Sequence, residues 1–167
     1  MENRGFSLFE LIGVLTITSI LILSAVPAFY ALIQEHRLRA AGQQLFGLLT
    51  SARATAVMRR KQITVWNEDG DWSSDVALFE DNNSNGEREP SEIVLARNPA
   101  QKDVTISGNR WVADYVKFAP DGSATTASGA FQVGTITVCR PDHSDAYQLI
   151  ISIGGRVRMI KSEIAAC

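Results

Sequence analysis

The chain has 167 residues, of which 46% are hydrophobic, and its formal net charge is −2. Outside an apolar N-terminal segment roughly 130 residues remain, which fits one domain of ordinary size and excludes a second. Because the net charge is small and negative, the whole molecule does not attract nucleic acid, so a polyanion site must be a local patch.

Residues 11–33 form an uncharged, apolar run. A helix of this length, at about 1.5 Å per residue, spans about 34 Å and can cross the hydrocarbon core of a bilayer. A polar leader with Glu2 and Arg4 ends at Gly5, and Glu10 lies at the edge of the apolar run. An ionisable side chain at the edge of a membrane helix is costly without a partner, so Glu10 implies a counter-charge. A secretory signal would instead end in a small-residue cleavage site after the apolar run.

The segment from Gly5 to Glu10 resembles the class III signal of type IV pilins and type II secretion pseudopilins. Ser7 and Phe9 replace the Thr and Ile of the common form, which leaves the glycine, the aromatic residue and the carboxylate in place. The resemblance implies that a prepilin peptidase cleaves after Gly5 and that the new terminus at Phe6 is N-methylated. It also implies that Glu10 pairs with the N-terminal ammonium of a neighbouring pilin subunit during assembly.

The same resemblance implies a location. The protein would be a single-pass protein of the bacterial inner membrane with its C-terminal domain in the periplasm, and after assembly it would lie in a pilus at the cell surface. Its partners would be the prepilin peptidase, other pilin subunits and, before assembly, the inner membrane. An ordinary single-span anchor is the alternative.

Helical periodicity continues beyond the apolar run. We therefore divide the chain into a leader (1–5), a transmembrane and assembly helix (6–33), an amphipathic helix (34–61) and a β-rich C-terminal domain (62–167). The basic residues at 59–61 suit the negative end of the helix dipole. Apolar residues recur at three- and four-residue steps at Leu38, Ala41, Leu45, Leu48, Ala52 and Ala56.

From Gln62 onward short apolar runs alternate with turn residues, which predicts strands packed on the helix. One helix followed only by strands leaves no parallel crossover units, so we expect antiparallel pairing. The predicted fold class is α+β, with a long N-terminal helix packed on a C-terminal antiparallel β domain. The predicted strands are 63–66, 76–80, 93–97, 104–107, 116–118, 131–133, 135–139, 148–153 and 156–160.

Cys139 and Cys167 are the two cysteines of the chain. The implied orientation places both outside the cytoplasm, where an oxidising compartment favours the one pairing that two cysteines allow. We expect a disulfide that ties the chain end to a strand, and two unpaired thiols are the alternative.

Three later segments, 118–122, 135–139 and 149–158, resemble the minor-pilin branch that includes FimT, FimU and the pseudopilin GspH, and FimT most of all. The resemblance covers essentially the whole chain. It implies that incoming DNA binds to a Gly-Arg-x-Arg motif near the C-terminus, which Gly155, Arg156 and Arg158 match.

The chemistry of this motif suits phosphate. Arg156 and Arg158 are two apart on a predicted strand, so both side chains are expected on one face, and each guanidinium can bind a phosphate through two hydrogen bonds. Lys161 would add a third charge close by, and Lys102 and Arg140 are further candidate contacts. Such contacts bind double-stranded DNA without sequence preference and weaken with salt. The alternative is that the arginines protect an edge strand from aggregation.

A second motif has the spacing of a calcium loop, with Asp81, Asn83, Asn85, Gly86 and Glu92 in the required order. Strands rather than helices are predicted on both sides of it. A hairpin loop rich in Asp, Asn and Gly explains the same residues through turn propensity. We prefer the hairpin loop without a metal and keep calcium as the alternative.

No catalytic chemistry is indicated. His36 and His143 have no nucleophile or elbow motif beside them, and no phosphate-binding glycine loop is present. We therefore expect neither an enzyme nor a cofactor. The hypothesis is a minor type IV pilin that binds DNA for uptake in natural transformation. The alternative is a structural minor pilin or pseudopilin, like FimU or GspH, of a type IV pilus or type II secretion system without DNA binding.

Overall fold

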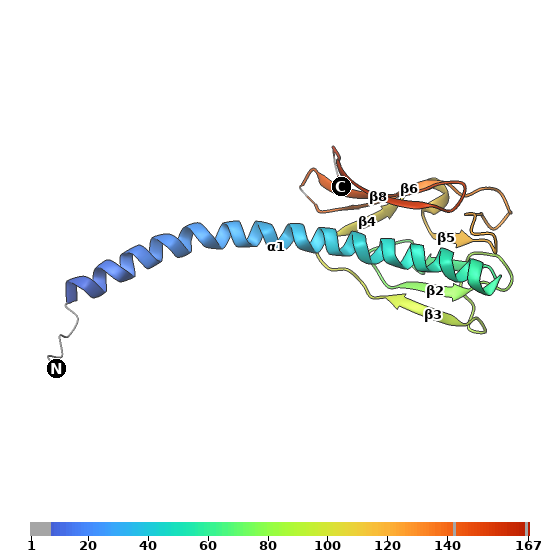
Figure 1. The fold of residues 1–167 in the computed structure, drawn as a ribbon, viewed down its shortest axis with the longest axis horizontal. Coiled ribbons are helices and arrows are strands. Elements are labelled where there is room, and N and C mark those ends of the chain that lie inside the picture. Colours follow the sequence, from blue (N-terminus) through green and yellow to red (C-terminus); the bar gives the residue numbers. More distant parts are fainter. Residues whose placement is uncertain (1–7, 142, 166) are drawn as a thin grey trace. The chain divides into compact units, whose positions relative to one another are not determined.

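The structure is a computed structural model that describes residues 8–141, 143–165 and 167. The chain divides into two compact units, residues 1–36 and 37–167. One helix, α1 (Leu8–Arg59), passes from the first unit into the second (Figure 1).

In the first unit α1 is long and apolar enough to cross a membrane. Its most apolar 18-residue window has a mean hydropathy of 2.2, and none of that window is buried within the described chain. The large apolar side chains between Leu8 and Ile33 are exposed, Phe9 at 86%. This finding concerns length, composition and exposure. It fits the predicted anchor because these side chains have no covering surface in the described residues.

The second unit adds two four-stranded sheets, and all strand pairs between neighbours are antiparallel. The predicted α+β fold class is thereby confirmed. Sheet A contains, in spatial order, β3 (Val94–Asn98), β2 (Val76–Glu80), β1 (Ile63–Asn67) and β5 (Tyr115–Phe118). Sheet B contains β4 (Thr105–Gly108), β6 (Gly134–Cys139), β7 (Asp145–Ile151) and β8 (Val157–Glu163), and a 3-10 turn, Arg110–Val112, precedes β5.

One core joins the second part of α1 to both sheets (Figure 1). The helix contributes an apolar stripe, and the sheets contribute the inward side chains of their strands. Leu49 is fully buried in this stripe, whereas the predicted Leu48 is only partly buried. Leu49 takes the place predicted for Leu48 because a step of four residues from Leu45 returns to the same face of the helix. The buried stripe is Leu38, Ala41, Leu45, Leu49, Ala52 and Ala56.

The strand predicted at 131–133 is wrong. Phe131 makes one isolated bridge, to Thr125, and both Phe131 and Val133 are exposed while Gln132 is buried. The Gln132 side chain accepts a hydrogen bond from the Lys117 backbone N–H and donates to the Tyr115 carbonyl. An amide side chain therefore binds the edge of β5 where a further strand was expected. The alternation of apolar residues around it was misleading because the polar residue faces inward.

Candidate functional site

The two arginines of the C-terminal motif lie where β7 turns into β8. The Gly155 N–H donates to the Ser152 carbonyl over 2.8 Å, and the Ser152 N–H donates to the Arg156 carbonyl over 3.1 Å. β8 begins at Val157, one residue later than predicted, so Arg156 lies at the end of the turn. The second hydrogen bond continues the β7–β8 pairing by one step, and Arg156 therefore follows the alternation of Arg158. Both side chains are exposed.

Arg158 belongs to the outer face of sheet B, the face turned away from the core. Arg158 pairs with Ile150, which pairs with Thr135, and strand alternation assigns every second residue to this face. No strand residue that this pattern assigns to the face carries a carboxylate, so Arg158 is its one charged strand residue within the described strands. The outward strand residues beside the pair include Ser107, Thr135, Thr137, Gln148, Ile150 and Ile160.

Gly155 has a structural reason to be glycine. Its φ is +69°, and a Cβ at this position would lie 2.0 Å from the Gly122 carbonyl oxygen. The turn between β7 and β8 is thus pressed against the turn at residues 119–123. Arg53 of α1 holds the two turns together, because its Nε donates to the Gly122 carbonyl over 2.9 Å and its Nη2 to the Gly154 carbonyl over 3.1 Å.

Arg53 is the residue that the sequence did not single out. It occupies a polar position of an amphipathic helix, and nothing in its local pattern distinguishes it from a solvated arginine. Its partners are 69 and 101 residues away in sequence. Only the tertiary fold brings it to the turns beside Arg156.

The other predicted cations are not gathered at the motif. Lys161 is three residues from Arg158 on β8, so strand alternation directs it to the opposite face, where its Nζ lies 3.6 Å from Asp145 Oδ1. Arg140 follows Cys139, at the end of sheet B opposite to the end where Arg156 lies. Lys102 precedes β4, whose pairing with β6 places it at the same end as Arg140.

The expected disulfide is confirmed. Cys139 and Cys167 are bonded, with a Cα–Cα distance of 5.7 Å and 28 residues of sequence separation. The bond ties the C-terminal residue to the end of β6. It lies at the end of sheet B that also carries Arg140, away from the hairpin of Arg156.

The loop at 81–92 covers part of sheet A, and most of its polar side chains form hydrogen bonds with other groups of the same loop. Asp81 is buried and accepts hydrogen bonds from Thr64 Oγ1 and from the Gly86 N–H. Glu92, also buried, accepts from two backbone N–H groups of the loop, and burial raises its pKa. Asn83 and Asn85 donate to Glu89, so their amide groups are engaged with a carboxylate.

A lysine lies beneath this loop. Lys117 is 2% exposed, and its Nζ donates to the Ser84 carbonyl over 2.9 Å. Burial lowers the pKa of Lys117, and the negative charge of Asp81 opposes that shift. The described residues contain no group of three or more His, Cys, Asp or Glu placed to hold a metal ion. The ammonium of Lys117 supplies positive charge beside Asp81, the first residue of the calcium-like motif.

At the N-terminal end, Gly5 and Phe6 lie outside the described residues. Glu10 lies in the first turn of α1, inside the apolar first unit. Its role in subunit assembly stays a prediction.

A continuous N-terminal helix, apolar in its first part and packed in its second part against antiparallel sheets, defines a pilin-like protein. Residues 41–155 match the family model described as type II transport protein GspH, and the chain belongs to this family. The match ends at Gly155, so Arg156 and Arg158 lie beyond the matched segment.

Solved structures share the fold. The type IV minor pilin FimU of Pseudomonas aeruginosa is similar over 80% of this chain and 96% of its own, with 19% identity and a TM-score of 0.63. The minor pseudopilin EpsH of the type 2 secretion system of Vibrio cholerae is similar over 74% of this chain and 96% of its own, with 10% identity and a TM-score of 0.50. A search of curated protein sequences gave no match. The chain is thus a pilin-like protein of the kind found in type IV pili and type II secretion systems.

Proposed function

We propose that this chain is a minor pilin that binds double-stranded DNA without sequence preference during uptake for natural transformation. The observation that carries the proposal is the exposure of Arg156 and Arg158 at the end of a sheet face whose strand positions hold no carboxylate. A chain with a net charge of −2 repels DNA as a whole, so capture requires such a local region.

The mechanism is electrostatic. The two guanidinium groups bind phosphates of the DNA backbone, and no base edge needs to be read. Arg53 fixes the turn that carries the pair, so less side-chain and backbone freedom is lost on binding. Two neutralised phosphates give modest affinity and a slope of log affinity against log salt of about −2.

The N-terminal steps belong to the same proposal. A prepilin peptidase removes residues 1–5, Phe6 becomes the methylated terminus, and Glu10 pairs with the N-terminal ammonium of a neighbouring subunit. The first unit anchors the chain in the inner membrane, with residues 37–167 in the periplasm, until the subunit joins the filament. Retraction of the pilus then supplies the work that moves bound DNA. No enzymatic activity is part of this function.

A gel-shift titration of the full chain in detergent micelles tests DNA binding. Wild type is expected to bind duplex DNA at low salt and to lose about tenfold in affinity between roughly 50 and 200 mM salt. The variant Arg156→Ala/Arg158→Ala is expected to lose binding. Arg39→Ala/Arg97→Ala is the matched control, because it removes the same charge from exposed positions on α1 and sheet A and should bind like wild type.

Equal binding by both double variants, or no binding by wild type, would refute the DNA-binding proposal. One observation favours a structural subunit in that case. Among the described strands β8 pairs with β7 alone, so β8 is an edge strand, and it carries Arg158 directly after Arg156. Charged side chains on an edge strand prevent pairing with other chains. Aggregation of Arg156→Ala/Arg158→Ala at concentrations where the control variant stays monodisperse would support that function.

A further inference from the structure

Phe131 is an exposed aromatic residue that the DNA-binding proposal does not use. Phe131 is 65% exposed and Val133 is 40% exposed, whereas Gln132 between them is fully buried. The alternation continues into β6, where the inward Ile136 is buried and the outward Thr135 is half-buried. Phe131 and Val133 therefore extend the row of outward residues of β6 on the outer face of sheet B.

This row lies on the same face as the arginines of the hairpin. Continuing the β6–β7 register by one step places Val133 beside Ser152. The Ser152 N–H donates to the Arg156 carbonyl over 3.1 Å, so Arg156 lies on the other side of Ser152. Because neighbouring strands are about 4.8 Å apart, Val133 and Arg156 are about 10 Å apart across the face, and Phe131 is two residues further along the row of Val133.

Backbone hydrogen bonds hold the segment of Phe131 against the hairpin. The Gln132 N–H donates to the Ala124 carbonyl over 2.8 Å, and the Ala124 N–H donates to the Ile153 carbonyl over 3.3 Å. The backbone that carries Phe131 is thus fixed relative to the turn that carries Arg156, although the ring itself is exposed. A ring held in this way loses little conformational freedom when a ligand binds to it.

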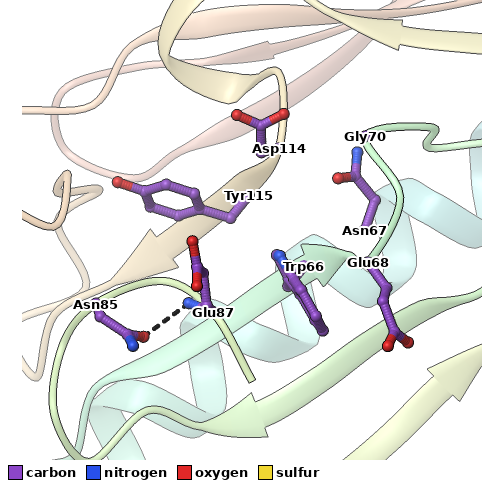
Figure 2. Close-up of a pocket in the computed structure, with 8 residues that line it drawn as sticks. All are labelled: Trp66, Asn67, Glu68, Gly70, Asn85, Glu87, Asp114 and Tyr115. Atoms are coloured by element: carbon purple, nitrogen blue, oxygen red, sulfur yellow. Dashed lines mark hydrogen bonds between the residues drawn. The ribbon is translucent and has the colours of Figure 1, made fainter. Parts of the chain in front are cut away.

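The aromatic rings of sheet A lie in a different electrostatic environment. Trp66 and Tyr115 line a cavity of about 350 Å³ on the outer face of that sheet (Figure 2). Three carboxylates line the same cavity, those of Glu68, Glu87 and Asp114. Within the described part of the chain none of the three takes part in an ion pair, so their charge repels a phosphate backbone. Phe131, by contrast, shares its face with arginines.

We propose that Phe131 stacks on an unpaired base of a DNA strand whose phosphates are bound by Arg156 and Arg158. Every base has a π-face, so stacking on an aromatic ring adds affinity without sequence preference, as phosphate contacts do. The inference rests on the proposed DNA binding and names the form of DNA that gains most at this face, which is a single strand or a single-stranded end.

The test is an anisotropy titration of the full chain in detergent micelles at low salt. The probes are a labelled single strand of mixed sequence and a strand of equal length and charge that carries stable abasic sites in place of its bases. Phe131→Ala is expected to weaken the mixed-sequence strand about tenfold and to leave the affinity for the abasic strand at its wild-type value, because only a base can stack.

Three further variants define the contact. Phe131→Tyr keeps an aromatic ring and should bind the mixed-sequence strand like wild type, whereas Phe131→Leu keeps an apolar side chain without a ring and should bind like Phe131→Ala. Ile93→Ala is the control, because it removes an exposed apolar side chain beside β3 of sheet A and should bind both strands like wild type.

Unchanged affinity of Phe131→Ala for the mixed-sequence strand, or an equal loss on the abasic strand, would overturn the inference. If Phe131→Ala binds DNA like wild type but is missing from filaments, the face contacts another subunit instead. Duplex binding separates the two proposals. If wild type binds duplex DNA through its arginines and Phe131 has no effect on the single strand, only the stacking inference fails, whereas both proposals fail if wild type binds no DNA.

Discussion

Gly155 belongs both to the Gly-Arg-x-Arg motif and to the contact between two turns of the fold. The arginines after it are exposed, whereas the glycine itself is buried against the Gly122 carbonyl with a positive φ. The glycine is therefore required by the backbone conformation of the hairpin, whereas the arginines determine the charge of its surface. The Gly-Arg-x-Arg motif predicts from residue type that the arginines can bind phosphate, but it does not predict the contact between Gly155 and Gly122.

Replacement of Gly155 by alanine is expected to lower the free energy of unfolding by about 1–3 kcal/mol, because an alanine must adopt positive φ and its Cβ meets the Gly122 carbonyl. Gly154→Ala is the control, since Gly154 has no atom within 4 Å of an added Cβ. That change should stay within about 0.5 kcal/mol of wild type. Thermal unfolding followed by circular dichroism measures both, and equal stability of the two variants would contradict this account.

Glu80 is buried where α1 ends, and it accepts hydrogen bonds from Lys61 and Arg59. These hydrogen bonds, from Lys61 first and then Arg59, hold the pKa of Glu80 below its ordinary value of 4.5. A carboxylate whose pKa is lower in the folded state stabilises the fold above its unfolded pKa. That stabilisation is lost as the pH falls through the folded pKa.

Glu80→Gln should therefore lower the free energy of unfolding by about 1–3 kcal/mol at neutral pH, because a charged acceptor of two hydrogen bonds is lost. The difference from wild type should shrink as the pH falls below about 4, where the wild-type carboxylate takes up a proton. Urea unfolding of both proteins between about pH 7 and pH 3 measures it. A difference that stays constant over this range would rule out the ionised carboxylate as the cause.

Among the elements, sheet B is fixed at its two ends by different means. The hairpin end is held by Arg53, and the opposite end is held by the disulfide between β6 and the chain terminus. Cys139→Ser/Cys167→Ser should cost about 3 kcal/mol, because closure of a loop of this length restricts the unfolded chain. Thermal unfolding checks the loss, and DNA affinity at low temperature should stay unchanged because the arginines lie at the other end. A parallel loss of DNA binding in the folded variant would contradict this separation.

The elements were largely predictable from the sequence. The apolar run, the amphipathic stripe and the alternating runs that follow depend on local periodicity, which can be seen directly in the order of apolar and polar residues. The segment at 131–133 failed because the side chain of Gln132, and not a strand backbone, binds β5. The disulfide was predictable because two cysteines allow one pairing.

The sites were predictable only in part. The shared face of Arg156 and Arg158 follows from their two-residue spacing, whereas the position of Arg53 requires contacts between segments far apart in the chain. Lys161 shows the limit of proximity in sequence. A residue three positions along a strand lies on the opposite face, so the Lys161 side chain lies near Asp145 and not beside Arg158.

At the scale of the whole molecule, the N-terminal signal makes a chemical prediction. Protein purified from its native host should begin at a methylated Phe6, as N-terminal mass spectrometry would show. Gly5→Val should retain residues 1–5, and Glu10→Ala should be processed normally yet be absent from filaments, because the counter-charge for a neighbouring terminus is missing. A mature protein that begins at Met1 would contradict the assembly proposal.

Opposite charges lie on different sheets of the second unit. Cations gather at the hairpin of sheet B, and uncompensated carboxylates gather in the cavity of sheet A. The net charge of −2 does not reveal this separation of charge.

The hydrogen bonds of Arg53 also set a mechanical path. When an edge strand is pulled from its end, its backbone hydrogen bonds to the neighbouring strand break one after another. Since Arg53 joins the carbonyls of Gly122 and Gly154 to α1, tension applied at the hairpin tip is divided between the β7–β8 ladder and the helix. A force applied at this hairpin therefore reaches α1 through Arg53 as well as through the pairing of β7 with β8.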